Sequence, residues 1–249
     1  MTLNRQSFRD TNKLYHYTSL DSAIRIIESK TLKFGRFSNM NDINESNRYV
    51  LPNFNENILT LPEVEDLCNQ KISEYGQISL TEDYENKNGF DIPALWGHYA
   101  NKGKGVCLVF DKALLLNNLD DNYLYESIRY DDDTSTMSLF GEITENGIVD
   151  LDERQLFEKS SDWKYEQEFR IISKAGNTNF LSFGNSLIAV ILHSVNFDYS
   201  NSLEYKILNK IDPDVPILRY FNSLGTRVLI NGPVENCYWS SIENYEIDI

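Results

Sequence analysis

Two short runs of consecutive apolar residues constrain the fold of this chain most strongly. Residues 106–110 follow a Gly-Lys-Gly turn, and residues 187–193 have the most buried pattern in the sequence. Runs of this length with little polarity are typical of strands that are covered on both faces. The two runs therefore predict strands with other parts of the chain packed on either side.

Shorter patterns around these runs predict further strands and a few helices. Strands are expected where polarity alternates, and helices where apolar residues recur every three or four positions after a capping Thr or Ser. The expected strands are 13–17, 31–34, 76–80, 106–110, 165–173, 187–193 and 227–230. One helix is expected to begin after Thr18 or Ser19, and two more are expected over residues 92–100 and 203–210. Residues 35–62 are expected to be mostly loop and irregular helix, and the acidic stretch 117–160 to be irregular surface chain. Because strands outnumber helices, an α+β fold with a mixed, mostly antiparallel sheet is favoured over a doubly wound parallel sheet.

Charge and cysteine usage restrict the classes of partner and compartment. The 249 residues hold 23 Lys and Arg against 38 Asp and Glu, a formal charge of −15, which argues against tight, non-specific binding to nucleic acid or to an anionic membrane. Three scattered cysteines, Cys68, Cys107 and Cys237, suit reduced thiols in the cytoplasm. No segment has the apolar length of a signal peptide or a membrane span. A single domain over residues 1–249 is expected.

Residues 163–172, Trp-Lys-Tyr-Glu-Gln-Glu-Phe-Arg-Ile-Ile, form the most informative local pattern. If they form a strand, its period of two places Glu166, Glu168 and Arg170 on one face. Such a row suits either a salt-bridged surface edge or the wall of a cleft, where a carboxylate orients a substrate hydroxyl and the Arg holds a partner or a phosphate. Both interpretations remain open at this point.

Other candidate residues are hydroxyl-bearing, aromatic or imidazole side chains. His16 is expected at a strand end just before a helix, either as an ordinary hydrogen-bonded histidine or at the seat of a ribose or phosphate, and its neighbours Tyr15 and Tyr17 suit a core equally well. Ser79 and Thr81 are expected to place two hydroxyls on one side of a strand end. Further stacking or hydrogen-bonding surface is expected from Trp96, His98 and Tyr99. No dinucleotide, P-loop, zincin or hydrolase motif occurs, and the three histidines lack metal-ligand spacing, so no metal is expected.

Five ordered elements together resemble the family known as domain of unknown function 2971, which is widespread in bacteria and their phages. They are residues 14–19 (Leu-Tyr-His-Tyr-Thr-Ser), Asn41-Asp42 with Glu45, residues 79–81, Trp96 to Ala100 followed by Gly105 to Cys107 and Phe110-Asp111, and residues 163–170. The chain departs from the family pattern at Met40 and Ile43, where Phe and Pro are usual, and at Thr81, where Ser is usual. The resemblance spans about residues 13–195, and residues 196–249 match less well.

That family resembles, more distantly, the ADP-ribosyltransferase fold, a split β-sheet core that binds NAD. The resemblance implies Glu168 as the carboxylate that stabilises the ribosyl centre, Glu166 as the group that addresses the acceptor, and His16 as a holder of the ribose or of the nicotinamide amide. It implies Tyr99 against the nicotinamide ring and Arg170 or Thr18 at the pyrophosphate. The full implied NAD-binding set is His16, Tyr17, Thr18, Asn41, Asp42, Ser79, Thr81, Trp96, Tyr99 and Arg170, with no metal.

Three functions are therefore carried forward from the sequence. The first is transfer of ADP-ribose from NAD to a macromolecule, a protein rather than a nucleic acid given the acidic charge, in phage–host conflict or defence. The second is a catalytically inactive module that binds a nucleotide or a protein. The third is a carboxylate-based hydrolase acting on nucleotides or glycosides, with Glu166, Glu168 and Asp42 as candidates. Glu168→Gln is expected to abolish turnover and to leave the fold intact, and the acidic loop 131–147 suits a lid, an acceptor-recognition loop or plain surface chain.

Overall fold

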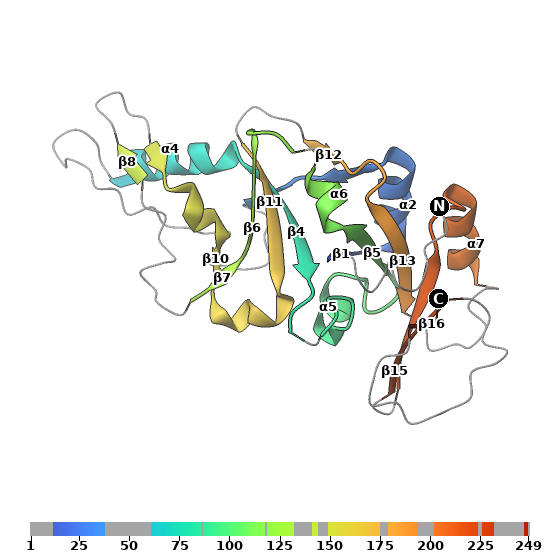
Figure 1. The fold of residues 1–249 in the computed structure, drawn as a ribbon. Helices are drawn as coiled ribbons and strands as arrows, with labels where there is room; N and C mark the ends of the chain where they lie inside the picture. The colour runs from blue at the N-terminus through green and yellow to red at the C-terminus, as the bar shows by residue number, and fades with distance from the viewer. Residues whose placement is uncertain are drawn as a thin grey trace. The chain divides into compact units, whose positions relative to one another are not determined.

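A computed structural model describes residues 12–37, 61–85, 87–117, 119–131, 141–143, 149–174, 179–193, 202–223, 226–231 and 247–248. They form an α+β structure with a mixed, mostly antiparallel open sheet and several helices, which confirms the predicted fold class at this level (Figure 1). The chain contains two compact units, each built from separate segments, and the single domain expected over residues 1–249 stays a prediction. The first unit takes residues 1–32, 80–118 and 182–249, and the second takes residues 33–79 and 119–181.

Six strands and the end of a seventh form the sheet of the first unit. Their order is β16 (Ile247–Asp248), β15 (Thr226–Asn231), β14 (Ile217–Ser223), β13 (Leu187–His193), β5 (Val106–Asp111), β1 (Lys13–Thr18) and the last residues of β4 (Gly76–Glu82). Strand β5 pairs antiparallel with both β1 and β13, while β13 and β14 run parallel. Residues 106–110 of β5 are completely buried, which confirms the prediction of a strand covered on both faces.

The helices of the first unit begin where the sequence supplies a cap or a proline. Helix α2 (Leu20–Ser29) begins after Ser19, whose side chain accepts a hydrogen bond from the backbone N–H of Ser22 at 3.2 Å. Helix α5 (Pro93–His98) carries its Pro in the first turn, as predicted. The described residues of this unit also form helices α6 (Lys112–Leu116) and α7 (Leu203–Ile211), and α7 contacts α2.

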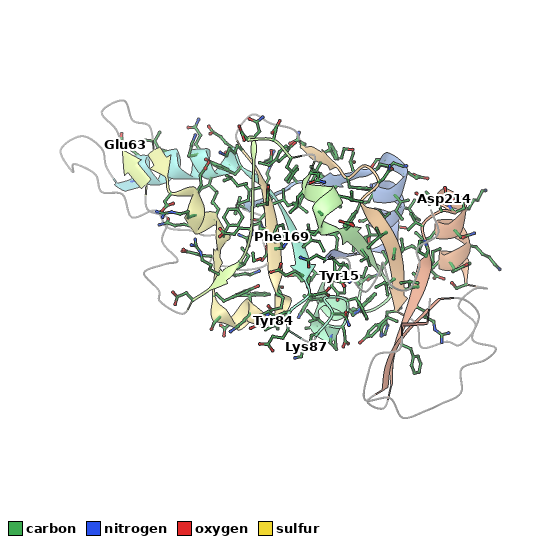
Figure 2. All side chains as sticks on the ribbon, viewed as in Figure 1. Tyr15, Glu63, Tyr84, Lys87, Phe169 and Asp214 are labelled. Atoms are coloured by element: carbon green, nitrogen blue, oxygen red, sulfur yellow. The ribbon has the colours of Figure 1, made fainter. Side chains whose placement is uncertain are left out.

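An aromatic core fills the first unit. Tyr15 is fully buried among these side chains (Figure 2), and the rings of Trp96 and Tyr220 stack with centroids 5.8 Å apart. The core cluster consists of Tyr15, Tyr17, Phe90, Leu95, Trp96, Ala100, Cys107, Val109, Ala189, Ile191, Leu218 and Tyr220. Tyr15, Tyr17, Tyr220 and Phe90 thus bury a part of the aromatic content of the sequence in this core.

The second unit has a smaller sheet and its own core. Strands β4, β11 (Glu168–Ser173) and β6 (Tyr123–Ser127) lie in that order, and β3 (Gly35–Arg36) pairs with β4. Two short pairs accompany them: β7 (Arg129–Tyr130) with β10 (Glu158–Lys159), and β8 (Gly141–Ile143) with β9 (Val149–Leu151). The helical elements are α4 (Leu61–Ser73) and two 3-10 helices, η2 (Glu153–Phe157) and η3 (Ser161–Glu166). Two further strands, β2 (Thr31–Lys33) and β12 (Phe180–Ser182), fall at boundaries between the units in the sequence.

The prediction of irregular surface chain over residues 117–160 is wrong for most of the described part of that stretch. It contains β6, β7, β8, β9, η2 and β10, and it contributes Ile128, Leu156 and Phe157 to the core of the second unit. Ile128 stands alone between Ser127 and Arg129, and Leu156 and Phe157 form an isolated pair, so this stretch lacks the continuous apolar run that marked the other strands. Within residues 35–62, the described part comprises β3, Phe37 and the start of α4, while positions 38–60 lie outside the described residues.

The predicted strand over residues 165–173 is correct only from Glu168 onward. Ser160 caps the 3-10 helix η3, which ends at Glu166. Gln167 then adopts a left-handed backbone conformation, with φ at +47°, before β11 begins. Glu166 therefore does not belong to the strand that carries Glu168 and Arg170, and the expected single row on one strand face is wrong for this residue.

Across the described parts of the chain, no helix has both the length and the apolar composition needed to cross a membrane.

Candidate functional site

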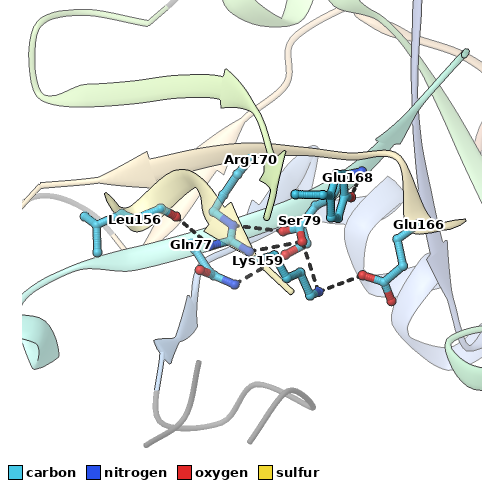
Figure 3. Close-up of polar contacts among 8 residues, drawn as sticks. Gln77, Ser79, Leu156, Lys159, Glu166, Glu168 and Arg170 are labelled. Atoms are coloured by element: carbon cyan, nitrogen blue, oxygen red, sulfur yellow. Dashed lines mark hydrogen bonds and ion pairs between the residues drawn. The ribbon is translucent and has the colours of Figure 1, made fainter. Parts of the chain in front are cut away.

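Four charged side chains meet in the second unit at the start of β11 (Figure 3). Glu166 comes from the end of η3, Glu168 and Arg170 from β11, and Lys159 from β10. Glu166, Glu168 and Arg170 are 5%, 3% and 0% exposed, and Lys159 is 9% exposed. We call these four residues the carboxylate cluster. Because they are buried, the interpretation of this segment as a salt-bridged surface edge is wrong.

Arg170 binds Glu168 through a two-pronged ion pair. Its Nε donates to Oε1 at 2.9 Å and one terminal nitrogen donates to Oε2 at 3.0 Å, while the other terminal nitrogen donates to the carbonyl of Leu156 at 2.6 Å. The guanidinium also lies 6.0 Å from the ring centroid of Phe37. A bidentate guanidinium–carboxylate pair fixes both groups in orientation as well as in charge. These contacts assign Arg170 to Glu168, and a phosphate-binding role for Arg170 stays a prediction.

Lys159 connects the two glutamates. Its Nζ lies 2.7 Å from Oε2 of Glu166 and 3.2 Å from Oε2 of Glu168, and 4.8 Å from the ring centroid of Trp163. Strand β10, which carries Lys159, pairs in parallel with β7, and Lys159 lies opposite Tyr130 in this pair. Sequence reasoning missed Lys159, because it lies in a polar stretch with no motif of its own.

Glu168 is held in its ionised form. Burial alone acts to raise its pKa, but the charges of Arg170 and Lys159 outweigh burial, and hydrogen bonds from Arg170 and Ser79 act in the same direction, so the pKa falls to about 2. A carboxylate has about four lone-pair sites, and two donors of Arg170, the Lys159 ammonium and the Ser79 hydroxyl match that number. Three of these donors are on buried cations, whereas Ser79 is an exposed residue.

Two further polar side chains support the cluster. The backbone N–H of Glu168 donates to the Tyr130 hydroxyl at 2.8 Å. Burial raises the pKa of Tyr130, so this hydroxyl keeps its proton across the physiological range. Gln77 is 2% exposed and donates through Nε2 to the Ser79 hydroxyl at 3.4 Å. Ser79 is thus placed between a buried amide and a buried carboxylate. Sequence reasoning missed Tyr130 and Gln77 as well.

Tyr17 and Trp96, two of the predicted NAD-binding residues, lie in the core of the first unit. They are 7% and 3% exposed, and their rings meet edge to face with centroids 5.2 Å apart. The Tyr17 hydroxyl donates to the carbonyl of Gly89 at 2.7 Å, and the Trp96 indole N–H donates to the carbonyl of Phe90 at 2.8 Å. These contacts match the alternative that the aromatics around His16 pack a core. A role in binding NAD stays a prediction for both residues.

His16 is half-buried and lies within β1, opposite Leu108 of β5. The expectation that it ends the strand is wrong, because the ladder with β5 continues through Thr18. Thr18 and Thr81 are buried, at 9% and 6% exposed, and Tyr99 is half-buried at the end of α5. The strand end predicted at Thr81 is likewise displaced, since β4 runs on to Glu82.

The structure therefore divides the predicted site residues into two groups. The second unit brings together Ser79, Glu166, Glu168 and Arg170, and the first unit contains His16, Tyr17, Thr18, Thr81, Trp96 and Tyr99. Asn41 and Asp42 lie outside the described residues. Within the described ranges, no group of three or more His, Cys, Asp or Glu side chains is arranged to hold a metal ion.

Comparison with known proteins gives one match. No curated protein and no solved structure matches this chain. The matched family is described as "Protein of unknown function (DUF2971)", and the matched segment contains the Trp96 to Ala100 element and all four residues of the carboxylate cluster. Over residues 95–171 the chain is similar to this family, which confirms the family resemblance predicted from the sequence.

Proposed function

We propose that the protein cleaves the bond between nicotinamide and ribose in NAD and transfers ADP-ribose to an acceptor. The observation that carries this proposal is the state of Glu168: a buried carboxylate kept ionised by two cations, with one of its hydrogen-bond donors on an exposed residue. Breaking a glycosidic bond of this kind creates an oxocarbenium-like centre, which a nearby ionised carboxylate stabilises. The predicted resemblance to the ADP-ribosyltransferase fold points in the same direction.

We expect a ribose hydroxyl to reach Glu168 by replacing the hydroxyl of Ser79 as its hydrogen-bond donor. Ser79 donates to Glu168 and is exposed, whereas the other donors belong to buried side chains. A ribose hydroxyl that replaces the Ser79 hydroxyl restores the hydrogen bond that it displaces, so the exchange costs little. The Arg170 fork meanwhile keeps the carboxylate in a fixed orientation.

The proposed reaction proceeds by loss of nicotinamide and attack of the acceptor. The bond from ribose C1′ to the nicotinamide nitrogen breaks, its electron pair stays with that nitrogen, and nicotinamide leaves as a neutral molecule. Positive charge develops on the ribosyl group, where Glu168 stabilises it. A nucleophilic oxygen or nitrogen of the acceptor bonds to C1′, and its proton passes to a base, for which Glu166 is the candidate.

The test uses the purified chain with NAD labelled in the adenylate moiety and a cell lysate. Label on macromolecules together with nicotinamide release, both lost in Glu168→Gln, supports the transferase and identifies the class of acceptor. Free ADP-ribose without labelled acceptor supports the hydrolase alternative instead. Absence of both nicotinamide release and transfer contradicts the proposal.

A second candidate is a nucleotide-binding protein without turnover. The observation that favours it is the number of donors on Glu168, which matches the number of lone-pair sites a carboxylate offers. A carboxylate whose lone pairs are all occupied in this way orders the side chains around it. It stabilises a positive centre less well than a carboxylate with a free lone pair does. Saturable binding of NAD or ADP-ribose by calorimetry, with no nicotinamide release over hours, supports this candidate.

A further inference from the structure

Lys159 lies between the two buried carboxylates, Glu166 and Glu168. Its side chain is 6% exposed, and its Nζ lies within ion-pair distance of both Glu166 and Glu168. A buried ammonium is costly unless carboxylates or other acceptors surround it. The chain carries this cost at a site where Arg170 already neutralises Glu168. The position of Lys159 therefore calls for a role beyond neutralising Glu168.

We propose that Lys159 is a positioning residue that holds Glu166 beside Glu168 and sets the orientation of both carboxylates. This inference rests on the proposed function, because positioning concerns the groups assigned there to the ribosyl centre and to the acceptor. Lys159 acts through the two glutamates and contacts neither substrate.

The backbone between Glu166 and Glu168 explains why a side chain is needed to hold the two carboxylates together. Glu166 and Glu168 are two positions apart, but η3 ends at Glu166 and Gln167 adopts a left-handed conformation before β11 begins. Regular secondary structure therefore does not fix one carboxylate relative to the other. A single ammonium that binds both of them supplies this link, at 2.7 Å and 3.2 Å.

Electrostatics require the same link. Two like charges that approach closely in a buried site repel each other, and the usual outcome without a shared cation is protonation of one of them. Lys159 lowers the pKa of Glu168 together with Arg170. Charged and titratable groups from several described elements contact the two carboxylates or act on them: Lys159 from β10, Arg170 from β11, Tyr130 from β7, Tyr165 from η3 and the neutral Ser79 from β4.

The test compares Lys159→Met, which keeps the length of the stem and removes the charge, with Lys159→Arg, which keeps the charge. Lys174→Met is the matched control, because Lys174 lies in the same unit, is about one-third exposed and pairs with Glu153 at 3.6 Å. The full chain is labelled with ¹³C in its glutamate carboxyl groups, and their chemical shifts are followed by NMR as the pH falls.

In the wild-type chain and in Lys174→Met, Glu168 is expected to stay ionised down to about pH 3. In Lys159→Met its titration midpoint is expected to rise by about one pH unit or more, and Lys159→Arg is expected to restore a low midpoint. Unchanged titration of Glu168 in Lys159→Met overturns the proposal. Lys159→Gln replaces Lys159→Met if the latter does not fold.

Kinetics of nicotinamide release supply the second readout. Lys159→Met is expected to lower kcat at least about ten-fold and to change KM for NAD little, with partial recovery in Lys159→Arg, because misplaced carboxylates slow the chemical step. Equal kcat in the wild type and Lys159→Met overturns the positioning role. If the wild-type chain releases no nicotinamide, the proposed function fails, and the carboxyl titration still decides whether Lys159 controls the two glutamates.

Discussion

Glu168→Gln is expected to weaken the fold of the second unit, in contrast to the expectation from the sequence that it leaves folding intact. Glu168 is 3% exposed and accepts from Arg170 and Lys159, which are buried as well. A neutral glutamine removes the negative charge that both cations bind in the structure, while Glu166 stays on Lys159. Removal of one member of a buried ion pair is among the most destabilising of single substitutions.

The size of the effect follows from the ionisation of Glu168. Its pKa falls from an ordinary value of 4.5 to about 2 in the folded chain. Each unit of difference corresponds to about 1.4 kcal/mol, so the folded environment favours the ionised form by about 3 kcal/mol. A loss of about 3 kcal/mol is large beside the total of about 5 to 15 kcal/mol typical of a domain, yet it leaves the variant folded at low temperature.

The pH dependence has a definite sign. Because the pKa is lowered on folding, the contribution of Glu168 is present in full above the unfolded value near 4.5 and is lost as the pH falls toward 2. The difference in free energy of unfolding between the wild type and Glu168→Gln is therefore expected to be about 3 kcal/mol at pH 7. It is expected to shrink steadily between about pH 4.5 and pH 2.

Denaturant unfolding followed by tryptophan fluorescence measures this difference, and hydrogen exchange across β11 assigns it to the second unit. Glu74→Gln is the matched control, because Glu74 lies in the same unit and pairs on the surface with Lys71 at 2.9 Å. A surface pair contributes less than about 1 kcal/mol. Equal stability of Glu168→Gln and Glu74→Gln at pH 7, or a difference that grows as the pH falls, would refute this reasoning.

Two further predictions concern the first unit. Tyr17→Phe removes the hydrogen bond to the carbonyl of Gly89 and is expected to cost about 1 kcal/mol of unfolding free energy in denaturant unfolding. An unfolding free energy equal to that of the wild type would contradict a contribution of this bond. Gly105→Ala is expected to lower stability by at least about 2 kcal/mol in thermal and denaturant unfolding, because a Cβ at this position would lie 2.2 Å from the carbonyl oxygen of Thr18. A melting temperature equal to that of the wild type would contradict the close approach at Gly105.

Continuous apolar runs made the central strands predictable. The expected strand 187–193 coincides with β13, and the expected strand 106–110 extends by one residue in β5. Helix α5 was predicted from its leading Pro, and the helix after Ser19 from its cap and its apolar face, of which Ala23 and Ile27 are buried. In these elements local pattern and burial agree, so the sequence is sufficient.

The carboxylate cluster was predictable only in part. The pattern of residues 163–172 singled out Glu166, Glu168 and Arg170, and the structure brings these three together. The alternating polarity predicted a strand throughout, so the 3-10 helix η3 and the left-handed Gln167 that follows it were not foreseen. Lys159 joins the cluster only because the folded chain brings its ammonium to Glu166 and Glu168. A single sequence carries no local signal for this contact.

The most direct test of the central claim is the initial rate of nicotinamide release from NAD by the purified chain. The rate is measured for the wild type, Glu168→Gln, Glu168→Asp and Glu74→Gln at a low temperature at which hydrogen exchange shows β11 to be folded in all four. The proposal predicts release by the wild type and Glu74→Gln, a reduced rate in Glu168→Asp and a loss of at least about a hundred-fold in Glu168→Gln. A folded Glu168→Gln chain that releases nicotinamide at the wild-type rate, or a wild-type chain that releases none, would contradict it.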